Sequence, residues 1–504
     1  MKQIYQLQDN IPIFYESKKS RQVLVEFHDG NFLYINGIVD IKVIEGTIDI
    51  WGYHMTSNTE KTTIYSSGLY GLIAIQSKNK KKTLVLLEES NLSCDWKAFM
   101  KNYIPDFNIF EPTNTRLTPQ KSIIDLEVQL NCQFDLSKTP ISNHRLVTDE
   151  QWEGFGNELM NCSVNQPMKI LFAGYQNAGK STMMCYFINK CLQKWSKVLV
   201  LDFDIGKSEF FIPGCISAFI IDSPLLGPNI THLKSPYKSY FFESTNVMTN
   251  INMYLEMAKA LTNDIKNDQY LEEMPIFINT MGFVKDEGLE ILHKLICITS
   301  PTDIVQLKLN EYQDLNLHSS IISDSTGATL SYNLWYFTSI VKVKLAKAPY
   351  YKSIEKPIKQ QLLITSYFST CLRNTDIYFN DITPYHVNIQ NIDVHITEIN
   401  DLTRDEKLAV INANIVALCI SNKSNLCECV GFGFVRNVNM SSGDLYINTP
   451  VKLNNLINVN QLRLGKITLP YTFYTKGLPI LRYISTKQDN IFNESVTRHY
   501  KIMH

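Results

Sequence analysis

The sequence predicts an α/β protein in which a central domain, built on a parallel sheet, lies between two β-rich domains. Three observations favour this fold. Strand-like alternation fills the first hundred residues, strands and helices alternate from about residue 165, and strand-like alternation returns beyond residue 375. The expected boundaries are residues 1–112 for the N-terminal β-rich domain, 113–164 for a linker and entry helix, 165–372 for the central domain, and 373–504 for the C-terminal β-rich domain.

Residues 32–53 of the N-terminal region alternate polar and apolar positions, which is typical of strands with one buried face. Residues 41–43 and 47–50 flank the turn signal Glu45-Gly46, and we expect them to pair as a hairpin. The lysine cluster at residues 78–82 lies between two further apolar runs. It is interpreted as the solvated tip of a hairpin, with a nucleic-acid contact as the alternative.

The central domain carries the pattern G-x-x-x-x-G-K-[ST] between an apolar run and an amphipathic stretch. The octet comprises Gly174, Tyr175, Gln176, Asn177, Ala178, Gly179, Lys180 and Ser181. Glycines in such a strand–loop–helix unit let backbone N–H groups converge on a phosphate at a helix N-terminus. Lys180 is then expected to reach the β- and γ-phosphates, and the Ser181 hydroxyl to hold Mg²⁺. The pattern predicts binding of a nucleoside triphosphate, and the alternative is a chance match in a glycine-containing turn.

Four strands are expected in the central sheet, and the second of them ends in two carboxylates. The strands are residues 170–173, 198–202, 276–279 and 304–307. Asp202 and Asp204 stand at positions i and i+2 beside the P-loop, where a Walker-B carboxylate belongs. Asp202 is predicted to approach Mg²⁺, and Asp204 to act as the base for an alcohol that accepts a phosphoryl group. The alternative is that one carboxylate only caps the turn to the next segment.

The composition is that of an ordinary soluble protein, with 44% hydrophobic and 19% charged residues. A net charge of −1 gives no global field that attracts nucleic acid, so such binding depends on a local patch. Eleven cysteines without C-x-x-C, and ten histidines without H-x-x-H, indicate reduced thiols in an intracellular compartment and argue against a metal motif. No signal peptide and no membrane-spanning apolar run is recognised, so no membrane partner is expected.

With these motifs placed, the chain resembles the polynucleotide 5′-hydroxyl kinases over most of residues 30–470. Residues 201–215 are similar to the family's D-x-D-x-G-Q-x-E-F…P-G-C segment, and residues 279–285 to its clasp, N-T-x-G-W-x-K. Several stretches resemble the nucleolar protein 9 branch, which acts in ribosomal RNA processing. They are residues 41–46, 431–436, 445–450, and Val459-Asn460 with Gly465.

The resemblance implies a P-loop kinase domain that moves the γ-phosphate of ATP, or another nucleoside triphosphate, onto the 5′-hydroxyl end of RNA. In this branch the kinase works with a HEPN-type endoribonuclease, which cuts internal transcribed spacer RNA and leaves a 5′-hydroxyl end. The kinase's C-terminal region contacts and activates that nuclease. Location in the nucleus, and there in the nucleolus, is implied in the same way.

The resemblance also assigns roles residue by residue. The residues that would bind the triphosphate and Mg²⁺ are Gly174, Gly179, Lys180, Ser181 and Thr182. Asp204 aligns with the family's general base, and Thr280 and Gly282 would form the clasp near the RNA terminus. Phe283 takes the place of the family's Trp, where a ring can stack on a base for roughly 1–3 kcal/mol. The alternative for Phe283 is a core aromatic residue that follows a strand.

Two departures from the family concern charge. Lys207 replaces the family's Gln, which introduces a cation near the RNA end. The lid carries Lys356 and Lys359 in place of arginines, so the charge that would stabilise the transferring phosphoryl group is kept without the bidentate fork. The alternative for these two lysines is surface charge at a helix start. His232 could touch RNA, although a loop histidine is more often structural.

Two rival functions follow. One is a weakly active or inactive kinase-fold scaffold that binds nucleotide and activates the endoribonuclease, which Lys207 and the lysine-only lid favour. The other is a switch-type P-loop NTPase. The central domain lacks an N-K-x-D guanine-reading motif, and the clasp resemblance favours a polynucleotide acceptor.

Overall fold

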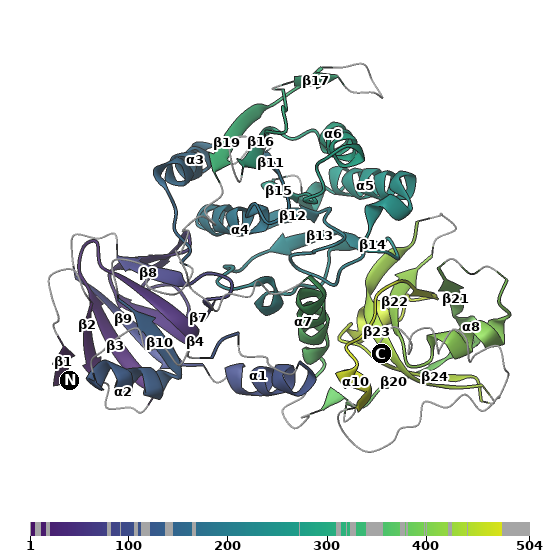
Figure 1. Ribbon diagram of the computed structural model, residues 1–504, viewed down its shortest axis with the longest axis horizontal. Coiled ribbons are helices and arrows are strands. Elements are labelled where there is room, and N and C mark those ends of the chain that lie inside the picture. The colour runs from purple at the N-terminus through teal and green to yellow at the C-terminus, as the bar shows by residue number, and fades with distance from the viewer. Residues whose placement is uncertain are drawn as a thin grey trace.

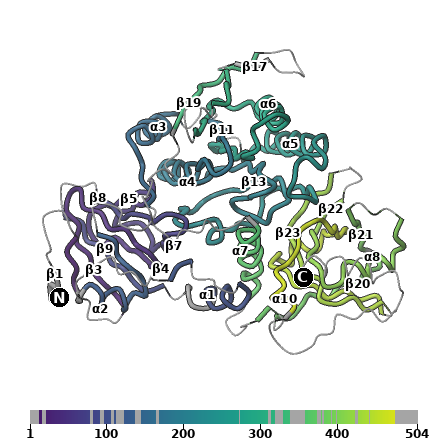
Figure 2. The backbone as a smooth tube through the Cα atoms, viewed as in Figure 1, coloured from purple at the N-terminus to yellow at the C-terminus, as the bar shows by residue number. Residues whose placement is uncertain are grey.

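The computed structural model describes most of the chain, and its elements form three connected regions (Figures 1 and 2). The described residues are 2–5, 12–16, 21–77, 82–90, 92–104, 109–111, 121–136, 145–163, 168–271, 273–308, 314–318, 320–322, 329–338, 356–372, 378–379, 382–397, 399, 401–421, 426–440 and 442–475. Across these ranges, no helix combines the length and the apolar character that a membrane crossing requires.

The N-terminal region forms an antiparallel sheet that a helix covers. Its strands are β1 (Lys2–Tyr5), β2 (Ile13–Glu16), β3 (Gln22–Phe27), β4 (Phe32–Glu45), β5 (Thr47–Ile50), β6 (Tyr53–Thr56), β7 (Thr62–Ser66), β8 (Ile73–Ser77), β9 (Thr83–Glu89) and β10 (Cys132–Asp135). The order is β1-β2-β3-β9-β4-β8-β5-β6, and β7 and β10 pair with β4. Helix α2 (Lys121–Leu130) packs on β3 and β9. The sheet therefore draws on chain beyond residue 112.

The expected hairpin around Glu45-Gly46 is wrong. The β4 residues before this turn pair with β9, whereas β5 pairs with β6 and β8. Gly46 has a φ of +83°, and a Cβ there would lie 2.5 Å from Thr83 Oγ1. The turn therefore carries the chain past β9 to another part of the sheet. The lysine cluster lies mostly outside the described residues, which include only its last member, Lys82, exposed and 2.7 Å from Glu26 Oε2.

The central region is a mostly parallel sheet with helices on both faces. Its strands are β11 (Lys169–Gly174), β12 (Val198–Asp202), β13 (Cys215–Ile221), β14 (Lys238–Phe241), β15 (Ile276–Asn279), β16 (Asp303–Lys308) and β19 (Asn333–Thr338). The order is β19-β16-β11-β15-β12-β13-β14, parallel from β19 to β12 and antiparallel beyond. All four strands expected from the sequence are present.

Side chains that alternate along β11 supply the two cores of this region. Phe172 packs with α4 (Lys180–Cys191) and α3 (Glu150–Asn161), whereas Leu171 packs with α5 (Ile251–Lys266) and α6 (Glu287–Thr299). Both faces of the sheet are therefore covered, as parallel strands require. The segments that follow β11, β12 and β15 leave the sheet at the same carboxyl edge, where α/β sheets bind ligands.

The C-terminal β-rich region continues the central sheet. Its elements are β20 (Tyr385–Asn388), β21 (Asp393–Ile396), α8 (Arg404–Ile411), β22 (Ile415–Ile420), β23 (Glu428–Asn439), β24 (Asp444–Asn448), α9 (Leu453–Leu456), β25 (Gln461–Leu464) and α10 (Thr472–Thr475). Tyr240 of β14 pairs with Glu428 of β23, whose carboxylate also lies 2.5 Å from Lys238 Nζ. The fold class predicted from the sequence is confirmed.

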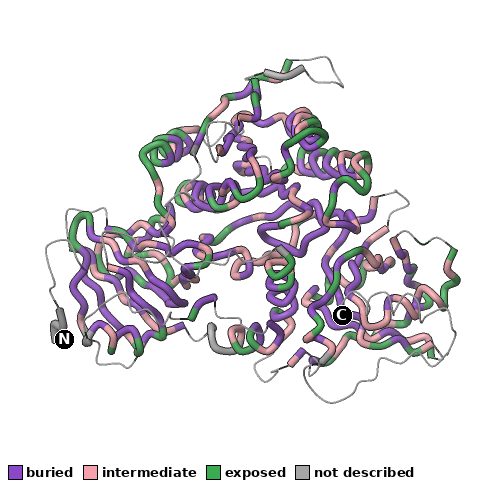
Figure 3. Tube along the Cα trace, viewed as in Figure 1, coloured by how far each residue is buried: buried purple, intermediate pink, exposed green. Residues whose placement is uncertain are grey.

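Helix α7 (Lys356–Ser369) lies where the three regions meet, between α1 (Leu92–Tyr103) and β23 (Figure 1). Its second half, residues 362–369, is buried (Figure 3). Leu362 and Leu363 pack against Met100 of α1 and Ile38 of β4. Helix α7, which carries the predicted lid lysines, is thus packed against the N-terminal region.

Candidate active site

The predicted P-loop joins β11 to α4 in the expected conformation. Gly174 has a φ of +146°, and a Cβ there would lie 2.6 Å from the carbonyl oxygen of Leu307 on β16. Gly179 caps α4 with a φ of +94°. The N–H of Ala178 donates to the Tyr175 carbonyl at 3.2 Å, which closes the loop. The loop therefore presents backbone donors at a helix N-terminus, a geometry that binds phosphate.

Lys180 is folded back over this loop. Its Nζ donates to the carbonyl oxygens of Gly174 at 2.8 Å and Tyr175 at 3.1 Å. Burial lowers the pKa of Lys180 to about 8, while the charge of Asp204 opposes the shift and that of Lys207 adds to it. The amine of Lys180 and the carboxylate of Asp204 thus lie close enough for each charge to shift the pKa of the other.

Asp202 is fully buried and accepts four hydrogen bonds. Its Oδ1 accepts from Asp204 N at 3.1 Å and Asn279 Nδ2 at 2.9 Å, and its Oδ2 accepts from Ser208 Oγ and Glu209 N, both at 2.9 Å. Burial and the charge of Asp204 raise its pKa to about 7, against these hydrogen bonds. The arrangement corresponds to the turn-capping alternative, and direct ligation of Mg²⁺ would require one of the four bonds to break.

Asp204 has one committed oxygen and one available oxygen. Oδ1 accepts from the backbone N–H groups of Gly206 at 3.1 Å and Lys207 at 3.0 Å. Within the described part of the chain, Oδ2 has no hydrogen-bond partner. Burial raises the pKa of Asp204 above its usual range, and the charges of Lys180 and Lys207 oppose this shift. A carboxylate in this state can accept a proton from a hydroxyl group.

The lid helix brings a third cation to the site. Gln360 Nε2 of α7 donates to the Gly206 carbonyl at 3.3 Å, so the helix start touches the turn that holds Asp204. Lys359 is half-buried, and burial followed by the charge of Lys207 lowers its pKa. Lys359 is therefore not a freely solvated surface charge. The side chain of Lys356 lies outside the described residues.

A tyrosine fixes the other end of α7 to the C-terminal region. Tyr367 Oη accepts from the backbone N–H of Phe432 at 2.8 Å and donates to the carbonyl of the same residue at 3.3 Å. A Cβ on Gly431 would lie 2.8 Å from this hydroxyl and 2.2 Å from Val451 Cγ2. The space that the Tyr367 hydroxyl occupies therefore requires glycine at position 431. Ser366 Oγ also donates to the Ile230 carbonyl at 2.5 Å.

The clasp packs directly against the P-loop. Thr280 is buried, and its hydroxyl donates to the Phe172 carbonyl at 2.6 Å. A Cβ on Gly282 would lie 2.6 Å from Gln176 Cα. Thr280 therefore holds the clasp on strand β11, Gly282 lets it approach the P-loop, and neither directs a side chain outward. Phe283 is 39% exposed, which disagrees with the core alternative and leaves its ring free to stack.

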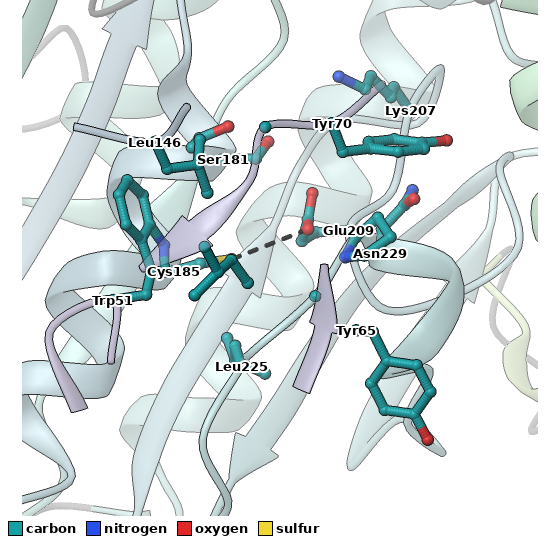
Figure 4. Close-up of a pocket in the computed structure, with 15 residues that line it drawn as sticks. Trp51, Tyr65, Tyr70, Leu146, Ser181, Cys185, Lys207, Glu209, Leu225 and Asn229 are labelled. Carbon is teal, nitrogen blue, oxygen red and sulfur yellow. Dashed lines mark hydrogen bonds between the residues drawn. The ribbon is translucent and has the colours of Figure 1, made fainter. Parts of the chain in front are cut away.

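A cavity opens beside the P-loop helix (Figure 4). Trp51, Tyr65 and Tyr70 of the N-terminal region form its aromatic side. Ser181 and Thr182 of α4 border it, and so do Lys207, Glu209 and Asn229. The N-terminal region thus completes a wall of the site.

Three family models match the chain in order. The N-terminal domain of polynucleotide 5′-hydroxyl-kinase NOL9 matches residues 12–83, the P-loop of mRNA cleavage and polyadenylation factor CLP1 matches residues 174–331, and the NOL9-like C-terminal domain matches residues 380–470. The two outer regions are thus similar to NOL9 domains, and the central region is similar to the CLP1 P-loop kinase domain. The resemblance drawn from the motifs is confirmed.

Relatives named polynucleotide 5′-hydroxyl-kinase NOL9 cover most of this chain. The protein of Dictyostelium discoideum is 26% identical over 92% of this chain and 83% of its own length, and that of Homo sapiens is 25% identical over 86% and 73%. The Caenorhabditis briggsae relative is 32% identical over 61% of this chain, which spans only 59% of that protein. A chain of a solved Clp1p–Pcf11p complex superposes with a TM-score of 0.54 at 16% identity, over 90% of this chain and 99% of its own. That likeness shows the shared fold.

Sequence reasoning assigned no role to four residues that shape the site. Asn279, the first residue of the clasp stretch, supports Asp202 from the end of a strand beside β12. Trp51, Tyr70 and Tyr367 carry no local signal, because each reaches the site through contacts between distant parts of the chain.

Substitution of Gly282 by Ala tests the packing of the clasp on the P-loop. The new Cβ would collide with backbone atoms of Gln176, so we expect ATP to bind about tenfold more weakly in isothermal titration calorimetry. Gly154→Ala is the matched control, since a Cβ there meets nothing within 4 Å on helix α3. The control should keep wild-type affinity and gain roughly 0.5–1 kcal/mol of stability. Wild-type affinity in Gly282→Ala would contradict the proposed contact.

Proposed function

We propose that the chain transfers the γ-phosphate of ATP to the 5′-hydroxyl end of RNA. The observation that carries this proposal is the available oxygen of Asp204, whose carboxylate lies within reach of the charges of the P-loop amine of Lys180 and of Lys207. A base beside a phosphate-binding loop serves a hydroxyl acceptor, whereas nucleotide binding alone does not require one.

In this mechanism the 5′-hydroxyl oxygen forms a bond to the γ-phosphorus, and the bond from that phosphorus to the bridging oxygen of ADP breaks. Asp204 Oδ2 takes the hydroxyl proton. Lys180 leaves the carbonyls of the loop for the phosphate oxygens, and Lys359 and Lys207 add positive charge near the transferring group. Positioning and charge supply most of the catalysis in reactions of this type.

Mg²⁺ fits the site in part. The Ser181 hydroxyl borders the cavity and forms no hydrogen bond to any described residue, so it would hold the ion as the P-loop pattern predicts. Asp202 would act through Ser208 or an intervening water, because its oxygens are already occupied. When bound, the ion would neutralise charge that develops on the phosphate oxygens.

The cavity fits the nucleoside end of ATP. It begins at Thr182, directly after the P-loop, and its aromatic side offers Trp51 and Tyr70 to a base. The RNA end would then approach from the clasp side, where the exposed ring of Phe283 can stack on a base and Lys207 can contact a phosphate.

The family supports a biological setting. We place the activity in processing of the ribosomal internal transcribed spacer, in the nucleolus of the nucleus, after a HEPN-type endoribonuclease has left a 5′-hydroxyl end. The C-terminal region, which matches the NOL9-like domain, is the proposed contact for that nuclease. The rival function is a kinase-fold scaffold that only activates the nuclease, and the lysines at positions 207 and 359 favour it. The next experiment distinguishes this scaffold from an active kinase.

Asp204→Asn removes the proposed base while it keeps the backbone contacts of the turn. We expect transfer of label from γ-labelled ATP to a 5′-hydroxyl oligoribonucleotide to fall by about 10²–10⁴-fold, with ATP affinity largely kept. Asp222→Asn, at an exposed carboxylate that pairs with Lys234, is the control and should retain activity. If the wild type binds ATP but transfers no label, the scaffold alternative holds.

The lowered pKa of Lys180 predicts a pH-dependent affinity for ATP. The amine loses its proton as pH rises through about 8, so the dissociation constant should increase above this pH by up to about tenfold per unit. Titration calorimetry between about pH 6.5 and about pH 9.5 measures this slope. Lys180→Arg keeps its charge throughout the range and should bind more weakly but without the slope. If the ATP dissociation constant rises with pH equally in wild type and Lys180→Arg, the group that titrates is not Lys180.

The hydrogen bonds between Tyr367 and the backbone of Phe432 predict that the C-terminal region positions the lid. Tyr367→Phe removes the hydroxyl that joins α7 to Phe432, which should lower kcat about 3- to 10-fold through a less fixed Lys359, with KM for ATP unchanged. Tyr474→Phe is the control, because its hydroxyl donates to the Ala413 carbonyl at 3.0 Å within the C-terminal region. Equal effects of the two substitutions on kcat would indicate general loosening of that region.

A further inference from the structure

Three side chains from separate segments meet beside the cavity, and two of them, Cys185 and Glu209, line it. Cys185 lies on α4, Glu209 follows β12, and His232 ends the 3₁₀ turn η1 (Asn229–Thr231). Cys185 Sγ lies 3.8 Å from Glu209 Oε1, and His232 Nε2 lies 3.2 Å from the same oxygen. The sulfur, oxygen and nitrogen atoms all lie within 4.8 Å of one another. Figure 4 shows Cys185 and Glu209 facing each other in the wall of the cavity.

The three side chains are buried, and their polar atoms are incompletely satisfied. Cys185 is 6% exposed, Glu209 is 7% exposed, and the His232 side chain is 8% exposed. No Lys or Arg among the described residues forms an ion pair with the Glu209 carboxylate, and His232 Nδ1 is buried without a hydrogen-bond partner there. Buried charge is ordinarily paired with an opposite charge or bound to a metal ion.

Their spacing fits a tetrahedral ion. Zinc binds sulfur at about 2.3 Å and nitrogen or oxygen at about 2.0–2.2 Å, which separates neighbouring ligand atoms by roughly 3.4–3.6 Å. The separations of 3.8 and 3.2 Å in the cluster bracket this range. We propose that Cys185, Glu209 and His232 bind a zinc ion, with the cavity side open for a water or a ligand atom as fourth partner.

This site would be separate from the one that Mg²⁺ uses. Cys185 lies one helical turn beyond Ser181, and its thiolate and the imidazole are ligands that select zinc over the hard, oxygen-seeking Mg²⁺. The ion would replace the thiol proton of Cys185. It would also join α4 to the segment whose Glu209 N–H donates to Asp202 Oδ2 at 2.9 Å. Zinc would therefore brace the turn that carries Asp204. Spacing in the sequence did not reveal the site, because each ligand comes from a different segment.

Cobalt is a suitable probe, since Co²⁺ enters zinc sites and its absorption reports both thiolate ligation and coordination number. Tag-free, chelator-treated full-length protein would be titrated with Co²⁺ in excess Mg²⁺. We expect one Co²⁺ per chain, a thiolate-to-cobalt charge-transfer band, visible bands of four-coordinate cobalt, and loss of these bands on addition of one equivalent of Zn²⁺.

Matched variants identify the ligands. Cys185→Ser should abolish the charge-transfer band, and His232→Asn and Glu209→Gln should each weaken Co²⁺ binding by at least about tenfold. Cys191→Ser, at another buried thiol of α4, should leave the spectrum unchanged. Circular dichroism and thermal unfolding establish that each variant is folded. The proposal is overturned if the wild type gives no band in excess Mg²⁺, or if folded Cys185→Ser keeps it. Neither result depends on kinase activity.

Discussion

The active site depends on the buried carboxylate of Asp202. Removal of an ion from water costs several kcal/mol unless hydrogen bonds replace those of the solvent. Four donors offset part of this cost here, from the backbone at Asp204 and Glu209 and from the side chains of Ser208 and Asn279. Because these donors belong to the turn after β12 and to the end of β15, one carboxylate fixes the turn on the sheet. This directs Asp204, two residues further along the chain, toward the P-loop. Asp202 itself keeps no oxygen free for a ligand.

Local pattern was sufficient to locate the parts of this site but insufficient to assign every role. The four central strands were predicted because each is an apolar run between helices, and the P-loop because its backbone requires glycine at fixed positions. The roles of Asp202 and Thr280 depend on which atoms they face after folding, and no spacing encodes that. The hairpin at Gly46 failed for a related reason: β4 finds its partner in β9, about forty residues along the chain, and turn chemistry does not report such pairing.

Contacts between regions explain why the flanking domains matter for the chemistry. The N-terminal sheet supplies the aromatic side of the cavity, and Asn189 of α4 donates to the Trp51 carbonyl at 3.0 Å, which ties that side to the P-loop helix. On the other side, β23 extends the central sheet and holds α7 through Tyr367. A partner that binds and displaces the C-terminal region would therefore also displace α7 and the lid lysines on it.

The electrostatics of the site favour an arriving polyanion. Lys180 and Lys359 are desolvated, and each lies near the charge of Lys207, so burial and repulsion lower the pKa of both. Desolvation and mutual repulsion of these ammonium groups raise the free energy of the ligand-free state. Phosphate oxygens lower this cost, because they replace the missing water and neutralise the charges. Opposing effects act on Asp204, because burial raises its pKa while two of these cations hold the shift back. A carboxylate balanced in this way has more affinity for a proton than a solvated one. The cations that bind the phosphates therefore also set the strength of the base.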